Sequence, residues 1–209
     1  MSEQPERWVV VLAASMDGRG APPGIDPFAF ALANLEDTYE VAAGLNLVRA
    51  TIACPPEHAG SAASLLWSGA DVIPTGDVRE VFARLAELGA TQSAVLSADA
   101  PDLPALAVGK LFRALGRADL AVSPCQRRGA VALAANLPLA PWLSDVDLGL
   151  DDTGLLDRLA AAAPRRSALA TTPGWHRLSE PSAVAFLDPG LEGWESTREL
   201  LEQTGLDGR

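Results

Sequence analysis

The chain has 209 residues, of which 48% are hydrophobic, so it is long enough to bury one well-formed core in one domain. Its 27 Asp and Glu residues outnumber its 16 Lys and Arg residues, and the formal net charge is −11. This balance argues against the basic face that binds a nucleic-acid backbone, so we expect no nucleic-acid partner.

The cysteines and the N-terminal residues bear on the cellular compartment. Cys54 and Cys125 lack a CxxC partner, which argues against a zinc site or a disulfide framework and favours reduced, buried thiols. The apolar run at residues 8–14 is too short for a signal peptide with its cleavage site or for a membrane span. We therefore expect a cytoplasmic protein that does not associate with a membrane.

Short apolar runs alternate with segments of helical spacing through roughly the first 125 residues. The runs are rich in β-branched residues, which is typical of buried parallel strands. The predicted strands cover residues 8–14, 48–53, 70–74, 93–97, 119–123 and 129–135. The predicted helices cover residues 28–43, 56–67, a segment that begins at the capping residue Asp77, and 106–115. This alternation predicts a three-layer α/β/α sandwich around a mostly parallel twisted sheet.

Beyond residue 137 the alternation loosens. The later predicted elements are an acidic loop at 142–153, a helix at 154–163, a strand at 183–187 and a helix headed by the capping-box spacing of Ser196 and Glu199. We treat residues 1–209 as a single domain. Within it, residues 138–182 form a less regular segment that is either a lid over the site or a connection.

Two acids, Asp99 and Asp102, directly follow the buried strand at 93–97. Open α/β sheets bind their ligands at the carboxyl edge, where such residues lie. A charge at the end of a buried strand needs a partner, so Asp99 is expected to meet a metal ion or an arginine. Asp102 precedes Pro104 and is interpreted as a cap of the helix that follows.

The loop after the first strand is a second candidate region. Its small residues could wrap a phosphate or a base with backbone N–H groups, and Arg19 could pair with phosphate oxygens. It matches neither a P-loop nor a dinucleotide fingerprint, and its composition is also that of a solvated loop. Asp188 follows the predicted late strand and is either a turn residue or a second metal-binding carboxylate. The segment Trp175-His176-Arg177 could stack on a base, although packing is the commoner role of Trp.

Three sequence features together resemble the nucleotide-diphospho-sugar transferase superfamily, which has the GT-A fold. They are SADAPDL at 97–103, Leu12-Ala13-Ala14 with Arg19, and Glu36-Asp37-Thr38 followed by the strand near 48–55. The nearest branch is similar to uncharacterised bacterial glycosyltransferase-A-like proteins related to molybdenum-cofactor and phospholactate guanylyltransferases. The likeness covers roughly residues 8 to 137.

The resemblance implies a metal-dependent nucleotidyl- or glycosyltransferase that binds a nucleotide or nucleotide sugar at the C-terminal edge of the sheet, with Mg²⁺ or Mn²⁺ as cofactor. The residues that it implies for nucleotide binding are Leu12, Ala13, Ala14, Ser15, Gly18 and Arg19. The residues considered for the metal are Asp99, which the resemblance implies, and Asp188.

The chain also departs from the pattern of this superfamily. Ser15 replaces a loop glycine, and no lysine occurs before Lys110. The expected acidic turn is replaced by Gln126-Arg127-Arg128-Gly129-Ala130, in which Arg127 and Arg128 could bind an anion instead of a metal. The alternative is therefore a catalytically degenerate relative that binds a ligand or partner on the same fold. The absence of GxGxxG argues against a Rossmann-like dehydrogenase, and a homodimer is compatible with the sequence.

Overall fold

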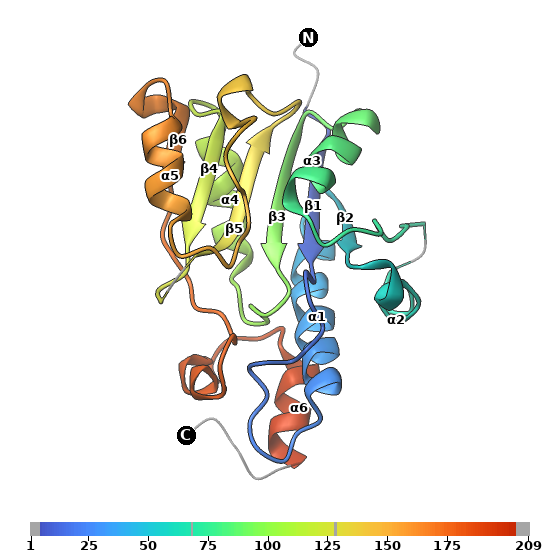
Figure 1. Cartoon of the computed structure of the whole chain (residues 1–209). Coiled ribbons are helices and arrows are strands. Elements are labelled where there is room, and N and C mark those ends of the chain that lie inside the picture. Colours follow the sequence, from blue (N-terminus) through green and yellow to red (C-terminus); the bar gives the residue numbers. More distant parts are fainter. Residues whose placement is uncertain (1–4, 68, 128, 204–209) are drawn as a thin grey trace.

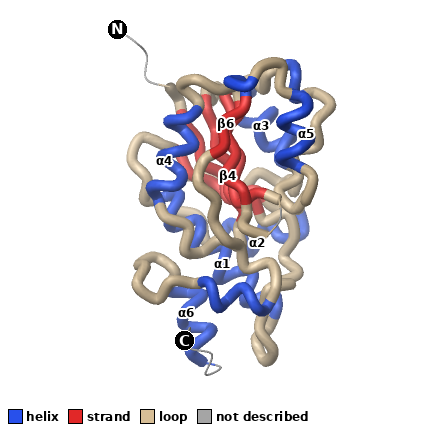
Figure 2. The backbone as a smooth tube through the Cα atoms, turned by 90° about the vertical axis from the view of Figure 1, so that its left-hand side faces the viewer, coloured by secondary structure: helices blue, strands red, loops and turns tan. Residues whose placement is uncertain are grey.

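The computed structural model describes residues 5–67, 69–127 and 129–203, and in these ranges a six-stranded sheet carries helices on both faces (Figure 1, Figure 2). The strand order is β2-β1-β3-β5-β4-β6. The strands are β1 (Arg7–Leu12), β2 (Arg49–Ala53), β3 (Gln92–Ser97), β4 (Leu120–Pro124), β5 (Ala130–Asn136) and β6 (Leu169–Thr171). Only β5 runs antiparallel to its neighbours, so the predicted mostly parallel α/β sheet is confirmed.

Helices cover the sheet because its central strands are apolar on both faces. The α-helices are α1 (Pro27–Ala43), α2 (Ala59–Ala63), α3 (Val78–Glu87), α4 (Ala105–Ala114), α5 (Leu155–Ala162) and α6 (Glu195–Gln203). Val9 and Val11 of β1 pack in one core with residues of α1 and α4, whereas Val10 packs in a second core with residues of α3 and α5. This alternation places one helix layer on each face of the sheet.

Helix α1 extends beyond the carboxyl edge of the sheet, where it supports a third, smaller core (Figure 1). There Phe30 of α1 packs with Trp194 and with Leu201 of α6. The helix begins where Asp26 accepts a hydrogen bond from Ala29 N at 2.8 Å, with Pro27 in its first turn. This third core brings the C-terminal residues to the edge at which the predicted site lies.

Several local predictions are wrong. Residues 70–74 form only an isolated bridge, Ala53 with Ile73, and residues 56–67 contain a short 3-10 turn and the five-residue α2. The predicted strand at 183–187 is part of a 3-10 helix, Pro181–Phe186, in which the consecutive residues Ala183 and Val184 are buried instead of alternating ones. Strand β6 is absent from the predicted strands, because none of its three residues is buried and it therefore lacks the apolar run of a buried strand.

None of the helices in the described part of the chain is both long and apolar enough to cross a membrane.

Candidate functional site

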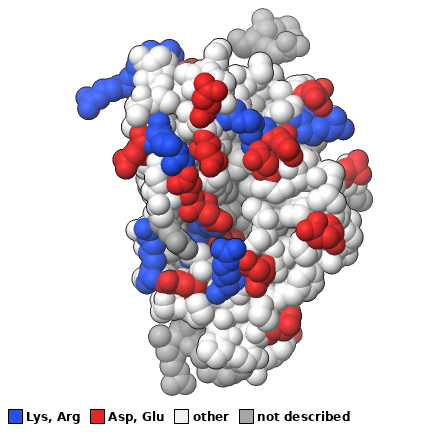
Figure 3. Space-filling model, in the orientation of Figure 1, with Lys and Arg blue, Asp and Glu red and all other residues white. Residues whose placement is uncertain are grey.

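A cleft of about 380 Å³ opens at the carboxyl edge of the sheet. Its lining comes from the loop after β1, the first half of α1, the start of α3, the end of β3 and two later segments, 149–151 and 177–179. Charged side chains of both signs gather on the face drawn in Figure 3. The structure therefore brings the predicted loop and Asp99 to one cavity, where an open α/β sheet binds its ligands.

The loop after β1 is held in shape by two glycines. Gly18 has a φ of +58°, and a Cβ atom there would lie 1.9 Å from the carbonyl oxygen of Pro27. A Cβ atom at Gly20 would lie 1.7 Å from the carbonyl oxygen of Leu178. Ala14 and Ser15 are exposed at the rim, whereas Leu12 and Ala13 are buried. All six predicted nucleotide-binding residues line the cleft.

Arg19 forms an exposed ion pair with Asp17, in which Nε and Oδ2 are 2.6 Å apart. Partial burial raises the pKa of Asp17, but hydrogen bonds from Arg19 and Ser15 outweigh it, so the pKa lies below its usual value. An exposed pair of this kind contributes at most about 1 kcal/mol to stability. The guanidinium of Arg19 can therefore leave Asp17 and bind an anionic ligand at a small cost in free energy.

Asp99 meets an arginine in the structure. Arg177 donates to both carboxylate oxygens, from Nε to Oδ1 at 2.7 Å and from Nη2 to Oδ2 at 3.1 Å. Ser97 Oγ donates to Oδ1 at 2.7 Å. The sequence predicts either a metal ion or an arginine as the partner of Asp99, and in the structure an arginine, Arg177, occupies this position.

Asp102 does not cap α4, so this prediction is wrong. The N-cap residue of α4 is Pro104, and no side chain caps it. The Asp102 carboxylate is fully buried and accepts a hydrogen bond from Trp175 Nε1 at 3.0 Å. His176 Nε2 lies 2.9 Å from the same oxygen, but at an angle outside that of a hydrogen bond. The Asp102 carboxylate thus bonds to Trp175, which lies far along the chain, and not to the first turn of α4 as the local sequence predicts.

The other predicted residues that the structure describes do not line the cleft. Asp188 Oδ1 accepts from Gly190 N at 2.8 Å, which is the predicted turn role. Arg127 pairs with Glu180 and lies over the ring of Phe186. Gly129 has a φ of +68° and abuts the backbone of Leu150, whereas Arg128 lies outside the described residues.

Residues 172–180, which we call the strap, cross the carboxyl edge and connect these groups. Trp175 N donates to Pro124 O at 3.1 Å, and Leu178 N donates to Asp99 O at 2.7 Å. The strap supplies the side chains that meet Asp99 and Asp102. The sequence marked Trp175, His176 and Arg177 as an irregular segment, but it held no signal that would place them against these acids.

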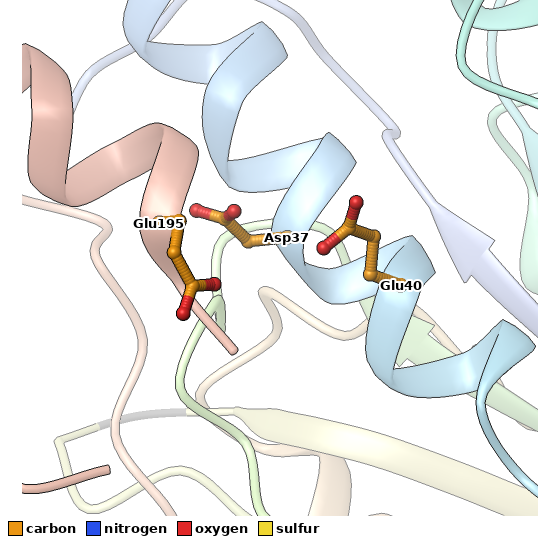
Figure 4. Close-up of side chains that lie close together, drawn as sticks. All are labelled: Asp37, Glu40 and Glu195. Carbon is orange, nitrogen blue, oxygen red and sulfur yellow. The ribbon is translucent and has the colours of Figure 1, made fainter. Parts of the chain in front are cut away.

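A second acidic group lies between α1 and α6, where Asp37, Glu40 and Glu195 approach one another (Figure 4). Asp37 accepts hydrogen bonds from Ser196 N at 3.0 Å and Thr197 N at 2.8 Å, and it thereby serves the first turn of α6. Burial raises the pKa of Asp37 to about 6, although the hydrogen bonds from these two residues oppose the rise. These contacts give the buried carboxylate a structural role.

Comparison with solved structures identifies the fold. A putative nucleotide-diphospho-sugar transferase from Desulfovibrio desulfuricans G20 matches with a TM-score of 0.71 and 14% identity, over 98% of this chain and 99% of that one. The fold is that of nucleotide-diphospho-sugar transferases. At this identity the likeness shows the fold alone. No family model matches the sequence, and a comparison with curated proteins found no significant match.

Two further structures with this fold were solved with nucleotides. A CMP:2-keto-3-deoxy-manno-octonic acid synthetase in complex with CTP has a TM-score of 0.57 at 14% identity, with 95% and 99% of the two chains covered. Glucosyl-3-phosphoglycerate synthase from Mycobacterium tuberculosis, in complex with Mg²⁺ and UDP, has a TM-score of 0.53 at 13% identity, with 83% and 70% covered. The structural neighbours thus include nucleotidyl and glycosyl transferases.

Proposed function

We propose that the protein is a nucleotidyl- or glycosyltransferase that binds a nucleotide or nucleotide sugar in the cleft at the carboxyl edge of the sheet. The observation that carries this proposal is the joining of the loop after β1 and the end of β3 in one cavity, on a fold whose solved examples include CTP and UDP complexes. The assignment to the branch related to guanylyltransferases, the cytoplasmic location and the homodimer stay predictions.

The loop after β1 offers two kinds of contact to such a ligand. Ala14 and Ser15 are exposed, and because their side chains are small, the backbone of this loop can approach a base or phosphate closely. Arg19 can donate two parallel N–H bonds to phosphate oxygens once it leaves Asp17. These residues would bind and orient the nucleotide in the cleft.

The fold implies a divalent cation, but the described arrangement around Asp99 does not fit one. Mg²⁺ prefers one or two free carboxylates together with substrate phosphate. Both oxygens of Asp99 accept from Arg177, and Asp188 does not line the cleft. The expected Mg²⁺ or Mn²⁺ at Asp99 and Asp188 therefore stays a prediction from the resemblance, and we assign no step to a metal ion here.

Thermal unfolding with a panel of nucleoside triphosphates, UDP and nucleotide sugars, each with and without Mg²⁺, tests the proposal. A ligand at a hundredfold excess over its Kd stabilises the folded state by about 2.7 kcal/mol. Ser15→Trp should abolish the shift by filling the cleft from an exposed position, whereas Ser64→Trp, exposed outside the cleft, should keep it. The absence of a shift with every ligand would exclude a nucleotide site.

The second candidate is a catalytically degenerate relative that binds a ligand or a partner. The replacement of the loop glycine by Ser15, the lack of a lysine before Lys110 and the pairing of Asp99 with Arg177 favour it. Incubation with the nucleotide sugar that binds, followed by chromatography of the products, separates the two candidates. Release of free nucleotide that stops in Ser15→Trp would exclude the degenerate relative.

A further inference from the structure

The guanidinium of Arg177 donates four hydrogen bonds to protein acceptors, and a second carboxylate lies against it. Besides the two bonds to Asp99, Nη2 lies 2.7 Å from Asp151 Oδ1. Nη1 lies 3.3 Å from each of the carbonyl oxygens of Ala130 and Leu150. Arg177 is therefore a cation between two carboxylates, and four of its five N–H groups are accounted for by hydrogen bonds to the protein.

Burial strengthens the hold of Arg177 on Asp99. The Arg177 side chain is 9% exposed and that of Asp99 is 24% exposed. Burial by itself lowers the pKa of Arg177, but the carboxylates of Asp99 and Asp151 more than reverse this, so the pKa lies above its usual value. A charged guanidinium that lost Asp99 would keep only the exposed carboxylate of Asp151 as its partner in a largely buried position, which is unfavourable.

The backbone on either side of Arg177 is fastened as well. Gln126 N donates to Trp175 O at 3.0 Å, and Leu178 N donates to Asp99 O. The close approach of Gly20 to Leu178 holds the strap from the side of the first loop. The backbone that carries Arg177 is therefore held at the carboxyl edge, so that only rotation of the side chain itself can separate the guanidinium from Asp99.

We propose that Arg177 takes the place of a divalent cation at this site, so that Asp99 and Asp151 bind its guanidinium and no metal ion. The bidentate contact occupies both oxygens of Asp99 with a guanidinium at the position where a metal ion held by Asp99 would otherwise lie. The inference rests on the proposed function and deepens it, because it says which group binds Asp99 beside a bound nucleotide. The metal preference of Asp99 itself can be measured without a nucleotide.

Titration with Mn²⁺ alone, followed by electron paramagnetic resonance, tests the proposal on the full chain. The wild-type protein should show no Mn²⁺ site that depends on Asp99. Arg177→Gln should gain one site that binds Mn²⁺ at least tenfold more tightly than any wild-type site at the cleft, and Arg177→Gln/Asp99→Asn should lose it again. Arg177→Lys keeps one positive charge and should not gain the site, even though lysine cannot form the bidentate contact.

The acidic group at Asp37, Glu40 and Glu195 needs its own control, because it could bind Mn²⁺ elsewhere. A signal removed by Glu40→Gln and retained in Asp99→Asn comes from that group and leaves the proposal supported. A wild-type Mn²⁺ site that disappears in Asp99→Asn overturns the proposal. This comparison needs no substitution of Arg177, so it decides the question even if Arg177→Gln does not fold.

Calorimetry with UDP as the probe, in EDTA and in Mn²⁺, separates this inference from the proposed function. If UDP binds equally well in EDTA and in Mn²⁺, the result supports both the proposed function and the role of Arg177. Binding that requires Mn²⁺ and is lost in Asp99→Asn overturns the role of Arg177 but keeps the nucleotide site. If neither UDP nor any other nucleotide binds, the proposed function fails, and the Mn²⁺ titration still decides whether Asp99 holds a metal.

Discussion

Gly20 and Leu178 touch through their backbones, although they belong to opposite ends of the chain. A Cβ atom at position 20 would lie 1.7 Å from the carbonyl oxygen of Leu178, far inside van der Waals contact. Leu178 N in turn donates to Asp99 O at 2.7 Å. The first loop, the strap and the end of β3 are therefore assembled as one unit, and the cleft depends on all three.

Gly20→Ala should destabilise the protein by about 3 kcal/mol, because backbone must move to admit the methyl group. Urea unfolding measures the change. Gly109→Ala is the matched control: it lies in α4 with open space around it, and alanine should stabilise the helix by about 0.5–1 kcal/mol. Equal stability of Gly20→Ala and wild type would contradict the close packing of the strap on the loop.

Asp102→Asn should cost about 2 kcal/mol of unfolding free energy. The substitution removes a buried negative charge that accepts from Trp175 Nε1 and lies 2.9 Å from His176 Nε2. Loss of this anchor should also loosen Trp175, which near-ultraviolet circular dichroism detects. Asp145→Asn, at an exposed position, should leave both measurements unchanged. A helix-cap role would instead predict reduced helix content without a change around Trp175.

The carboxyl of Asp37 should make stability depend on pH between about 4 and 6. Burial raises its pKa from 3.8 to about 6, so the folded state holds this proton more tightly than the unfolded state. Its contribution is fully present below about pH 4 and is lost as the pH rises through about 6. The Tm of wild type minus that of Asp37→Asn should therefore fall over this range and then level off. A difference that rises with pH would contradict the assignment.

Arg19→Gln should weaken nucleotide binding about tenfold, which corresponds to about 1.4 kcal/mol. Arg19 is the exposed cation of the cleft loop, and its pair with Asp17 contributes little to stability. The Tm of the ligand-free protein should therefore hardly change. Arg113→Gln, exposed on α4 outside the cleft, alters the net charge equally and should bind as wild type does. Equal losses in both variants would point to a general charge effect.

The sequence by itself determined the strands and helices that have strong local patterns. Strand β1 follows from the run of apolar β-branched residues, and the start of α3 follows from Asp77, which accepts a hydrogen bond from Glu80 N at 2.9 Å. The placement of the first loop and Asp99 at one edge followed from their position after parallel strands. Each of these features depends on residues close together in the sequence or on one rule of sheet geometry, so the order of residues along the chain is sufficient to predict it.

The tertiary structure alone decided what the acids after β3 do. The partner of Asp99 is Arg177, 78 positions away, and Asp102 meets Trp175, 73 positions away. The position of Asp102 near Pro104 is typical of a helix cap, but its carboxylate accepts a hydrogen bond from Trp175 of a distant segment instead. The strap could not be located from its own residues, because Leu178 is the only apolar residue in it that is buried. Its position follows from the backbone contacts with Gly20, Pro124 and Asp99, which belong to segments far from the strap in the sequence.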